Sequence, residues 1–167
     1  MAYSSHWDTN RFLYIRKDIM SKQKTLALFK PDVIEQNLSL KLIELIYQHG
    51  FVILAMETVR PSKELLKKHY KDLVDKPFFP ALLEYMTSQP ITALILEKEN
   101  AIDDWRELMG ATNPDNAKQG TIRGDYGQKH QTGNTLKNLV HGSDSIENAE
   151  REINLWFPKF GLVSTSK

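Results

Sequence analysis

Short β-rich apolar runs alternate along this chain with amphipathic segments of helical period, and this alternation limits the fold more than any other feature of the sequence. Strands are expected over residues 23–29, 51–59 and 91–96, and a fourth is expected to end at Val140. The third run is continuously apolar apart from Thr92, which is typical of a strand in the middle of a sheet.

Apolar residues recur at helical spacing between these runs. Helices are expected from Ser39 to Gly50, from Ser62 to Pro77, over 79–86, from Asn100 to Gly110 and over about 144–157. Gly50 is placed to end a helix in the left-handed conformation, Gly110 is expected to close another helix, and Asn100 with Asp103 resembles a capping box. Pro31 is expected to stop the first strand at a turn, and residues 111–137 read as a long loop.

The last helix is expected to begin with Ser143 or Asp144 as its cap and to turn Ile146, Ala149 and Ile153 inward. The order of elements predicts an α+β protein of the ferredoxin-like kind, with a four-stranded antiparallel sheet and helices covering it on one side. Residues 1–22 show no sustained period and are expected to form an N-terminal extension outside a single domain over 23–167.

Composition excludes several classes of protein. The 22 Lys and Arg against 21 Asp and Glu give a net charge of +1, so the chain has no global field for wrapping nucleic acid or binding an acidic membrane. No apolar run approaches the roughly 20 residues that span a bilayer. The absence of cysteine excludes disulfides and a catalytic thiol and fits a reducing compartment, so a cytoplasmic location is expected.

The stretch from Asn138 to Ser145 places His141 between a buried strand and the start of a helix. An anion beside His141 would meet free backbone N–H groups and the positive end of a helix dipole. A lone histidine at a strand end is more often a structural residue, and a lone Lys or Arg is usually solvated. Convergence of such groups at one place would instead form a phosphate clamp, for which the candidates are Lys30, Arg106, Thr112, Arg123 and His141.

Two aromatic residues leave alternatives open. Phe78 follows Pro77 at a helix start, beside Phe79, and it either packs in the core or stacks on a planar base. Tyr70 lies either at the edge of the core or within the site, and Asp72 nearby is at most an outer contact.

Six short motifs occur in one order along residues 23 to 158: Phe29-Lys30-Pro31-Asp32, His69-Tyr70, Pro77-Phe78-Phe79, Gly110-Ala111-Thr112-Asn113-Pro114, residues 120–125, and Asn138 to Ser145. In this the chain resembles the nucleoside diphosphate kinases. The resemblance implies a ferredoxin-like fold and transfer of the terminal phosphoryl group of a nucleoside triphosphate to a nucleoside diphosphate. The mechanism it implies is ping-pong, through a phosphohistidine.

By this resemblance the nucleophile falls on His141 and an active-site tyrosine on Tyr70. Glu152, two helical turns beyond Asp144, falls on the acid that orients the histidine region. The other family residues are phosphate-binding Arg106, Thr112 and Arg123, base-stacking Phe78, and the ribose contacts Lys30 and Asn138. Mg²⁺ is expected to arrive on the nucleotide phosphates, because no carboxylate cluster has metal-ligand spacing.

The family assembles as hexamers or tetramers, so a homo-oligomer is expected. The segment 126–137, with Gln128 to Thr135 at its centre, is longer than is usual in the family and falls near subunit contacts. Two other readings compete with the enzyme: a catalytically weak, nucleotide-sensing member of the same fold, and a ferredoxin-like RNA-binding module. The strands are aliphatic where RNA-binding modules carry aromatic residues, and the intact set around His141 argues against a weak member. Base preference and phosphate donor stay open.

Overall fold

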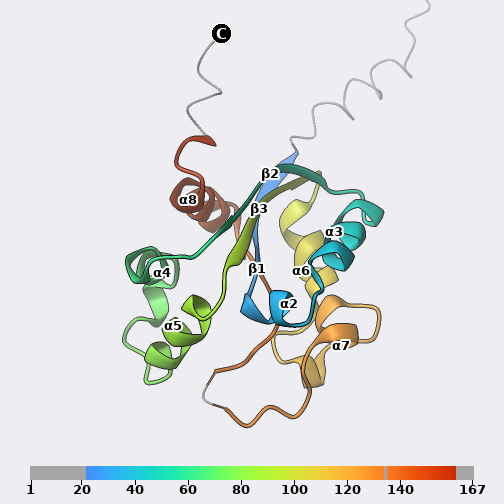
Figure 1. Ribbon diagram of the computed structural model, residues 1–167. Helices are drawn as coiled ribbons and strands as arrows, with labels where there is room; N and C mark the ends of the chain where they lie inside the picture. Colours follow the sequence, from blue (N-terminus) through green and yellow to red (C-terminus); the bar gives the residue numbers. More distant parts are fainter. Residues whose placement is uncertain (1–21, 134, 161–167) are drawn as a thin grey trace, which may run out of the picture.

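The computed structural model describes residues 22–133 and 135–160, arranged around one antiparallel sheet (Figure 1). Its strands are β1 (Gln23–Phe29), β2 (Val52–Val59), β3 (Ile91–Lys98) and β4 (Val140–Gly142), in the order β2-β3-β1-β4. Each neighbouring pair is antiparallel. The predicted four-stranded antiparallel sheet is confirmed, with the third run inside it. The predicted extension lies outside the described residues except for Lys22.

Seven α-helices and two 3₁₀ turns connect the strands within the described part of the chain. They are α2 (Pro31–Glu35), α3 (Ser39–Gln48), α4 (Lys63–His69), η1 (Lys71–Leu73), α5 (Phe79–Thr87), α6 (Ala101–Met109), η2 (Pro114–Asn116), α7 (Ile122–Tyr126) and α8 (Ile146–Trp156). The helices α2 and α7 and the turn η2 were not predicted. Pro31 does end the strand, but it also occupies the first turn of α2, where a missing N–H costs nothing. In the expected loop, the Thr121 side chain caps α7.

Helices cover both faces of the sheet, so the prediction of one covered side is wrong (Figure 1). The core on one face includes Ala27 and Phe29 of β1 together with residues of α3, α6 and α7. The core on the other face includes Leu26 and Leu28 with residues of α4, α5 and α8. The strand β1 directs apolar side chains to both faces of the sheet, so exposure of either face would leave large apolar side chains in water.

Some helix ends match those predicted from the sequence, and others differ from them. Gly50 and Gly110 have φ of +78° and +82°, as expected of residues that end helices. Asn100 makes no side-chain cap, so the expected capping box does not form. No helix of the described residues is long and apolar enough to cross a membrane.

The start of α8 differs from the prediction. Ser145 is the cap, and its side chain accepts a hydrogen bond from the backbone N–H of Asn148. Ser143 is unavailable as a cap because its hydroxyl is buried against Glu152, 2.7 Å away. The shift of the helix start leaves Ile146 59% exposed, so it does not face inward, whereas Ala149 and Ile153 are buried as expected.

Candidate active site

An open cavity of about 1060 Å³ lies where β1 ends and β4 begins. Its lining includes six of the residues that the sequence singled out: Lys30, Arg106, Thr112, Arg123, Asn138 and His141. These residues come from segments more than 100 positions apart, so the fold itself gathers them. The convergence that distinguishes a phosphate clamp from solvated cations is therefore present.

Lys30 and Asn138 form a buried pair at one wall of the cavity. The Lys30 ammonium donates to Asn138 Oδ1 over 2.6 Å, and Asn138 Nδ2 donates to the carbonyl of Thr112 over 2.9 Å. Burial, followed by repulsion from Arg123, lowers the pKa of Lys30 to about 8, although the charge of Asp32 acts in the opposite direction. A cation held this way gains an anionic partner readily, because a bound anion offsets the cost of its burial.

Arg123 holds three backbone segments together. Its Nε donates to the carbonyl of Asn138 over 3.0 Å, and its terminal nitrogens donate to Gly110 over 2.9 Å and to Val140 over 2.7 Å. A guanidinium has five N–H donors, so one on each terminal nitrogen remains for a ligand. Burial lowers the pKa of Arg123 to about 10. The side chain thus shapes the cavity wall and still offers two donors and a charge to it.

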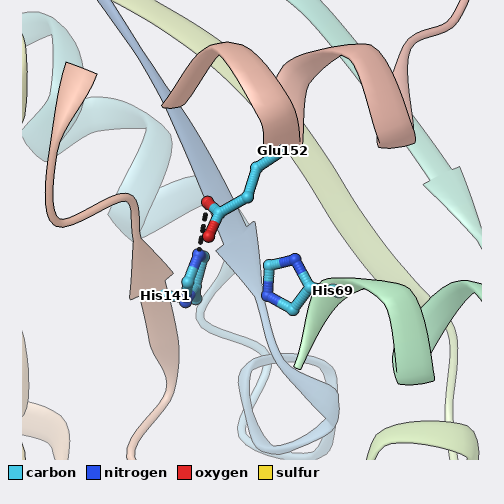
Figure 2. Close-up of side chains that lie close together, drawn as sticks. All are labelled: His69, His141 and Glu152. Carbon is cyan, nitrogen blue, oxygen red and sulfur yellow. Dashed lines mark hydrogen bonds and ion pairs between the residues drawn. The ribbon is translucent and has the colours of Figure 1, made fainter. Parts of the chain in front are cut away.

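His141 is held by a carboxylate from the facing helix (Figure 2). Its Nε2 lies 3.0 Å from Glu152 Oε2, and the same oxygen accepts the Ser143 hydroxyl over 2.7 Å. A carboxylate only accepts, so His141 Nε2 carries the proton and Nδ1 keeps a lone pair. The Trp105 indole donates to the His141 carbonyl over 3.0 Å, which fixes the backbone as well.

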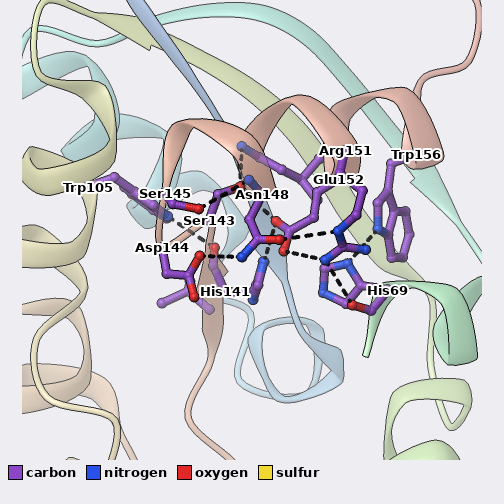
Figure 3. Close-up of polar contacts among 12 residues, drawn as sticks. His69, Trp105, His141, Ser143, Asp144, Ser145, Asn148, Arg151, Glu152 and Trp156 are labelled. Atoms are coloured by element: carbon purple, nitrogen blue, oxygen red, sulfur yellow. Dashed lines mark hydrogen bonds and ion pairs between the residues drawn. The ribbon is translucent and has the colours of Figure 1, made fainter. Parts of the chain in front are cut away.

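A second imidazole packs against the first on its buried side. The ring centroids of His69 and His141 are 4.5 Å apart and the rings are nearly perpendicular. The Trp156 indole N–H donates to His69 Nδ1 over 3.1 Å, so the proton of neutral His69 is on Nε2 (Figure 3). Burial lowers the pKa of His69 well below its usual range, which keeps it neutral beside the nucleophile candidate.

His69, His141 and Glu152 lie close enough to share a metal ion, but their proton positions do not suit one. The lone pair of His69 Nδ1 accepts from Trp156, and its Nε2 is protonated. His141 Nε2 donates to Glu152. Metal ligation needs an unprotonated imidazole nitrogen directed at the ion. The trio is therefore better described as a hydrogen-bonded support for His141 than as a metal centre.

Three of the predicted site residues do not line the cavity. Glu152 contacts His141, which does line the cavity. Tyr70 follows the end of α4, and its buried hydroxyl has no hydrogen-bond partner among the residues that the structure describes. Burial, together with the charge of Glu152, raises the pKa of Tyr70. Phe78 stands at the start of α5 with 42% of its surface exposed, so it belongs to neither core and its ring is free to stack.

Other residues of the site were not identified from the sequence. Lys118 lines the cavity and adds a cation to it. Arg151 donates to the carbonyl of Lys68 over 3.0 Å and lies 3.6 Å from Glu152 Oε1, which ties α8 to the end of α4 (Figure 3). Lys118 falls in a stretch without periodicity and Arg151 on the polar side of a helix, so neither carried a signal.

Comparisons with known proteins identify the family of the chain. The family model described as nucleoside diphosphate kinase matches residues 23–162. The chain is 48% identical over 140 residues to the nucleoside diphosphate kinase of Clostridium perfringens, covering 84% of this chain and 94% of that one. It is 45% identical over 141 residues to nucleoside diphosphate kinase B of Bos taurus, covering 84% and 90%.

A solved structure gives the same result. The crystal structure of the apo nucleoside diphosphate kinase of Encephalitozoon cuniculi, in its cubic form, superposes with a TM-score of 0.74 at 39% identity, covering 81% of this chain and 88% of that one. Its sequence identity is high enough for the likeness to extend beyond the fold. The chain belongs to the nucleoside diphosphate kinase family of phosphotransferases.

Proposed function

We propose that this enzyme transfers the terminal phosphoryl group of a nucleoside triphosphate to a nucleoside diphosphate by a ping-pong mechanism, with His141 phosphorylated on Nδ1. The observation that carries the proposal is the hydrogen bond from His141 Nε2 to Glu152, which leaves Nδ1 as the nitrogen with a lone pair. Nucleoside triphosphates and diphosphates are its partners. A cytoplasmic location and the absence of specific nucleic-acid binding stay predictions from the sequence.

In the first half-reaction, the Nδ1 lone pair forms a P–N bond as the bond from phosphorus to the bridging oxygen breaks, and the diphosphate leaves with that oxygen. The second diphosphate reverses these steps. Little proton transfer is needed, so alignment and charge neutralisation supply the catalysis. Lys30, Arg106 and Arg123 supply the positive charge around the cavity. Glu152 stabilises the positive charge that the imidazole ring gains in the transition state.

We propose that Mg²⁺ enters bound to the nucleotide phosphates and neutralises part of their charge. The donor set of the cavity fits this role, because its lining combines cations and amides with three carboxylates, Asp104, Glu107 and Asp144, of which Asp144 is three residues from His141 in the chain. Mg²⁺ prefers oxygen ligands and keeps several waters, so phosphate oxygens with an outer contact from Asp144 are sufficient.

The proposal is tested by incubating the enzyme with ATP labelled on the γ-phosphate. The label should become bound to protein, resist base and be lost in acid, as expected of a phosphohistidine. Adding any unlabelled nucleoside diphosphate should discharge it into the corresponding triphosphate. Initial rates at varied donor and acceptor should give parallel double-reciprocal lines. Turnover without a labelled intermediate, or intersecting lines, would contradict the ping-pong mechanism.

The lowered pKa of Lys30 predicts opposite effects of pH on binding and on stability. Above about pH 8 the ammonium loses its proton, so KM for nucleoside diphosphates should rise about tenfold towards pH 9.5. Between about 8 and the ordinary value of 10.5 the unfolded chain holds a proton that the folded chain has lost, so the free energy of unfolding should increase with pH. Steady-state kinetics and urea unfolding at both pH values measure the two effects. Lys30→Met should remove both, and persistence of either in that variant would assign it to another group.

Base recognition by Phe78 should be permissive, because stacking on an exposed ring reads no hydrogen-bond pattern. Phe78→Ala should raise KM by about 5- to 150-fold for every nucleoside diphosphate. The ratio of kcat/KM between purines and pyrimidines should stay nearly constant, and Phe78→Tyr should behave like the wild type. A loss confined to one base would mean that Phe78 is not the general base contact.

We propose that the chain forms a homo-oligomer, a hexamer or a tetramer. The support comes from exposed apolar side chains, which are Leu40 and Tyr47 of α3 and Val52, Leu54 and Met56 of β2, all at least 36% exposed. β2 is also an edge strand, whose unpaired backbone groups favour pairing with another chain. The inserted segment is the second proposed contact. Within its own subunit it is held by Gln131, whose side chain bonds to Gln128 and Lys137.

Met56→Asp should lower the molar mass measured by light scattering, because it places a charge among the exposed apolar side chains of β2. Val74→Asp is the matched control, since Val74 is 38% exposed but lies outside α3 and β2. Deletion of residues 128–135 tests the second contact in the same way. An unchanged mass in the Met56 variant would mean that the exposed apolar side chains of β2 are not at an interface.

A further inference from the structure

A γ-turn at Leu139 separates Asn138 from the strand that carries His141. Leu139 has φ of +68°, and the N–H of Val140 donates to the carbonyl of Asn138 over 2.8 Å. A γ-turn with positive φ is rare and strained, and its cost is highest for residues other than glycine. Leu139 is nevertheless fully buried and held in this conformation.

The turn changes which side chains share a face. In an extended strand, side chains three positions apart point to opposite sides. Here the adjacent Leu139 and Val140 belong to the same core, whereas neighbours in a regular strand point to opposite faces, and Asn138, Val140 and His141 all line the cavity. The strained turn therefore interrupts the alternation between Asn138 and His141, and both the amide and the imidazole reach the cavity.

A buried carboxylate holds the centre of this turn. Asp32 is 3% exposed and lies in the first turn of α2. Its Oδ2 accepts the N–H of Leu139 over 2.9 Å, and its Oδ1 accepts the Tyr85 hydroxyl over 2.5 Å. Asp32 does not line the cavity, so it does not contact a ligand there.

The remaining polar groups of the turn are also paired. The N–H of Lys30 donates to the Leu139 carbonyl over 2.7 Å, and Arg123 donates to the carbonyls on either side of Leu139. Asp32 is thus one of three groups from distant segments that fix the turn, and it alone takes the N–H of its strained residue. Without it, that buried N–H would lose its partner.

We propose that Asp32 is a positioning residue, which stabilises the strained turn at Leu139 and so keeps Asn138 and His141 directed into the same cavity. The inference rests on the proposed function only for its kinetic consequence. Strain at a functional site persists when surrounding contacts over-determine it, and Asp32 supplies the contact that opposes relaxation to an extended strand.

The first test compares Leu139→Gly with Leu139→Ala. Both variants remove the buried isopropyl group of the leucine and differ from each other by one methyl group, so most of the cavity in the core is common to them. At an ordinary strand position glycine is the less stable of the two, whereas at positive φ it should be the more stable. We expect a higher Tm for the glycine variant and a rate of His141 phosphorylation about 5- to 30-fold above that of the alanine variant.

The second test adds Asp32→Ala to each of these variants and to the wild type. Loss of the carboxylate should lower kcat/KM about 10- to 100-fold with Leu or Ala at 139, and clearly less with Gly, which adopts the turn unaided. Asp32→Asn should keep most of the activity, because its amide oxygen accepts from Leu139 while its NH₂ donates to Tyr85. Tyr85→Phe, which spares the contact to Leu139, should lose less than about tenfold.

Equal losses from Asp32→Ala with Ala and with Gly at 139, or a lower Tm for Leu139→Gly than for Leu139→Ala, would overturn the proposal. If Asp32→Ala does not fold, the comparison is made with Asp32→Asn, whose loss of most activity would show that the charge rather than the hydrogen bond matters. Failure of the proposed function is recognised separately, since the wild type would then form no phosphoenzyme while the Tm ranking at 139 would still report on the turn.

Discussion

Replacing His141 by alanine should abolish both the phosphorylated form of the enzyme and turnover, with kcat falling on the order of 10⁴-fold or more. The variant lacks the atom on which the P–N bond forms, while the cations of the cavity remain in place. Labelling with ATP and a coupled assay of triphosphate formation measure the two losses. Binding of nucleoside diphosphate, followed by calorimetry, should persist and would show that the site is intact.

His130→Ala provides the control, because the His130 side chain is 92% exposed and pairs with Asp115 away from His141. It should leave labelling and kcat unchanged. His69 is not an equivalent control, since its ring packs against that of His141 and accepts from Trp156. Substantial labelling in His141→Ala would assign the phosphorylated residue elsewhere.

The sequence predicted the sheet well because its signal is strong and local. The apolar runs over 26–29 and over 91–96, the latter interrupted only by Thr92, are typical of strands buried on both faces, and both lie in strands within the sheet. A strand that is apolar on both faces needs helices on both faces. The prediction that helices cover only one side of the sheet therefore did not use all the information in the sequence of β1. Gly50 and Gly110 were predicted correctly because positive φ leaves few other residues suitable.

The features that could not be predicted from the sequence depend on contacts between distant residues. Ser143 was a reasonable cap, but tertiary contact with Glu152 takes its hydroxyl, and Ser145 caps α8 in its place. The strain at Leu139 has no local signal, since leucine favours neither a turn nor positive φ. The turn is held by tertiary contacts, among them the hydrogen bond to Asp32, 107 positions away.

The candidate site was predictable in its membership more than in its geometry. Lys30, Arg123 and Asn138 line the same cavity as His141, but nothing in the sequence indicates that Arg123 donates to three backbone carbonyls. The sequence also gave no indication of which imidazole nitrogen is free. Both properties arise from side-chain orientation, which only the packed structure fixes.

Removing the Glu152 carboxylate should lower kcat with little change in KM, because Glu152 touches His141 and does not line the cavity. Glu152→Ala leaves the imidazole proton and the Ser143 hydroxyl without their acceptor and removes the charge that stabilises the ring in the transition state. A loss of kcat of roughly 10²- to 10³-fold is expected. Single-turnover phosphorylation by ATP measures the affected step directly.

Glu152→Gln separates orientation from charge. If the amide oxygen takes the place of Oε2, it accepts from both His141 and Ser143, so the tautomer with a free Nδ1 is retained while the negative charge is lost. The remaining loss should be about tenfold, the difference between a charged and a neutral acceptor. Glu150→Ala, an exposed acid on the same helix, should have no effect. If Glu152→Gln were as impaired as Glu152→Ala, the charge of Glu152 would matter more than its orientation of the ring. If Glu152→Ala kept kcat within about threefold of the wild type, this carboxylate would not be what keeps the lone pair on Nδ1.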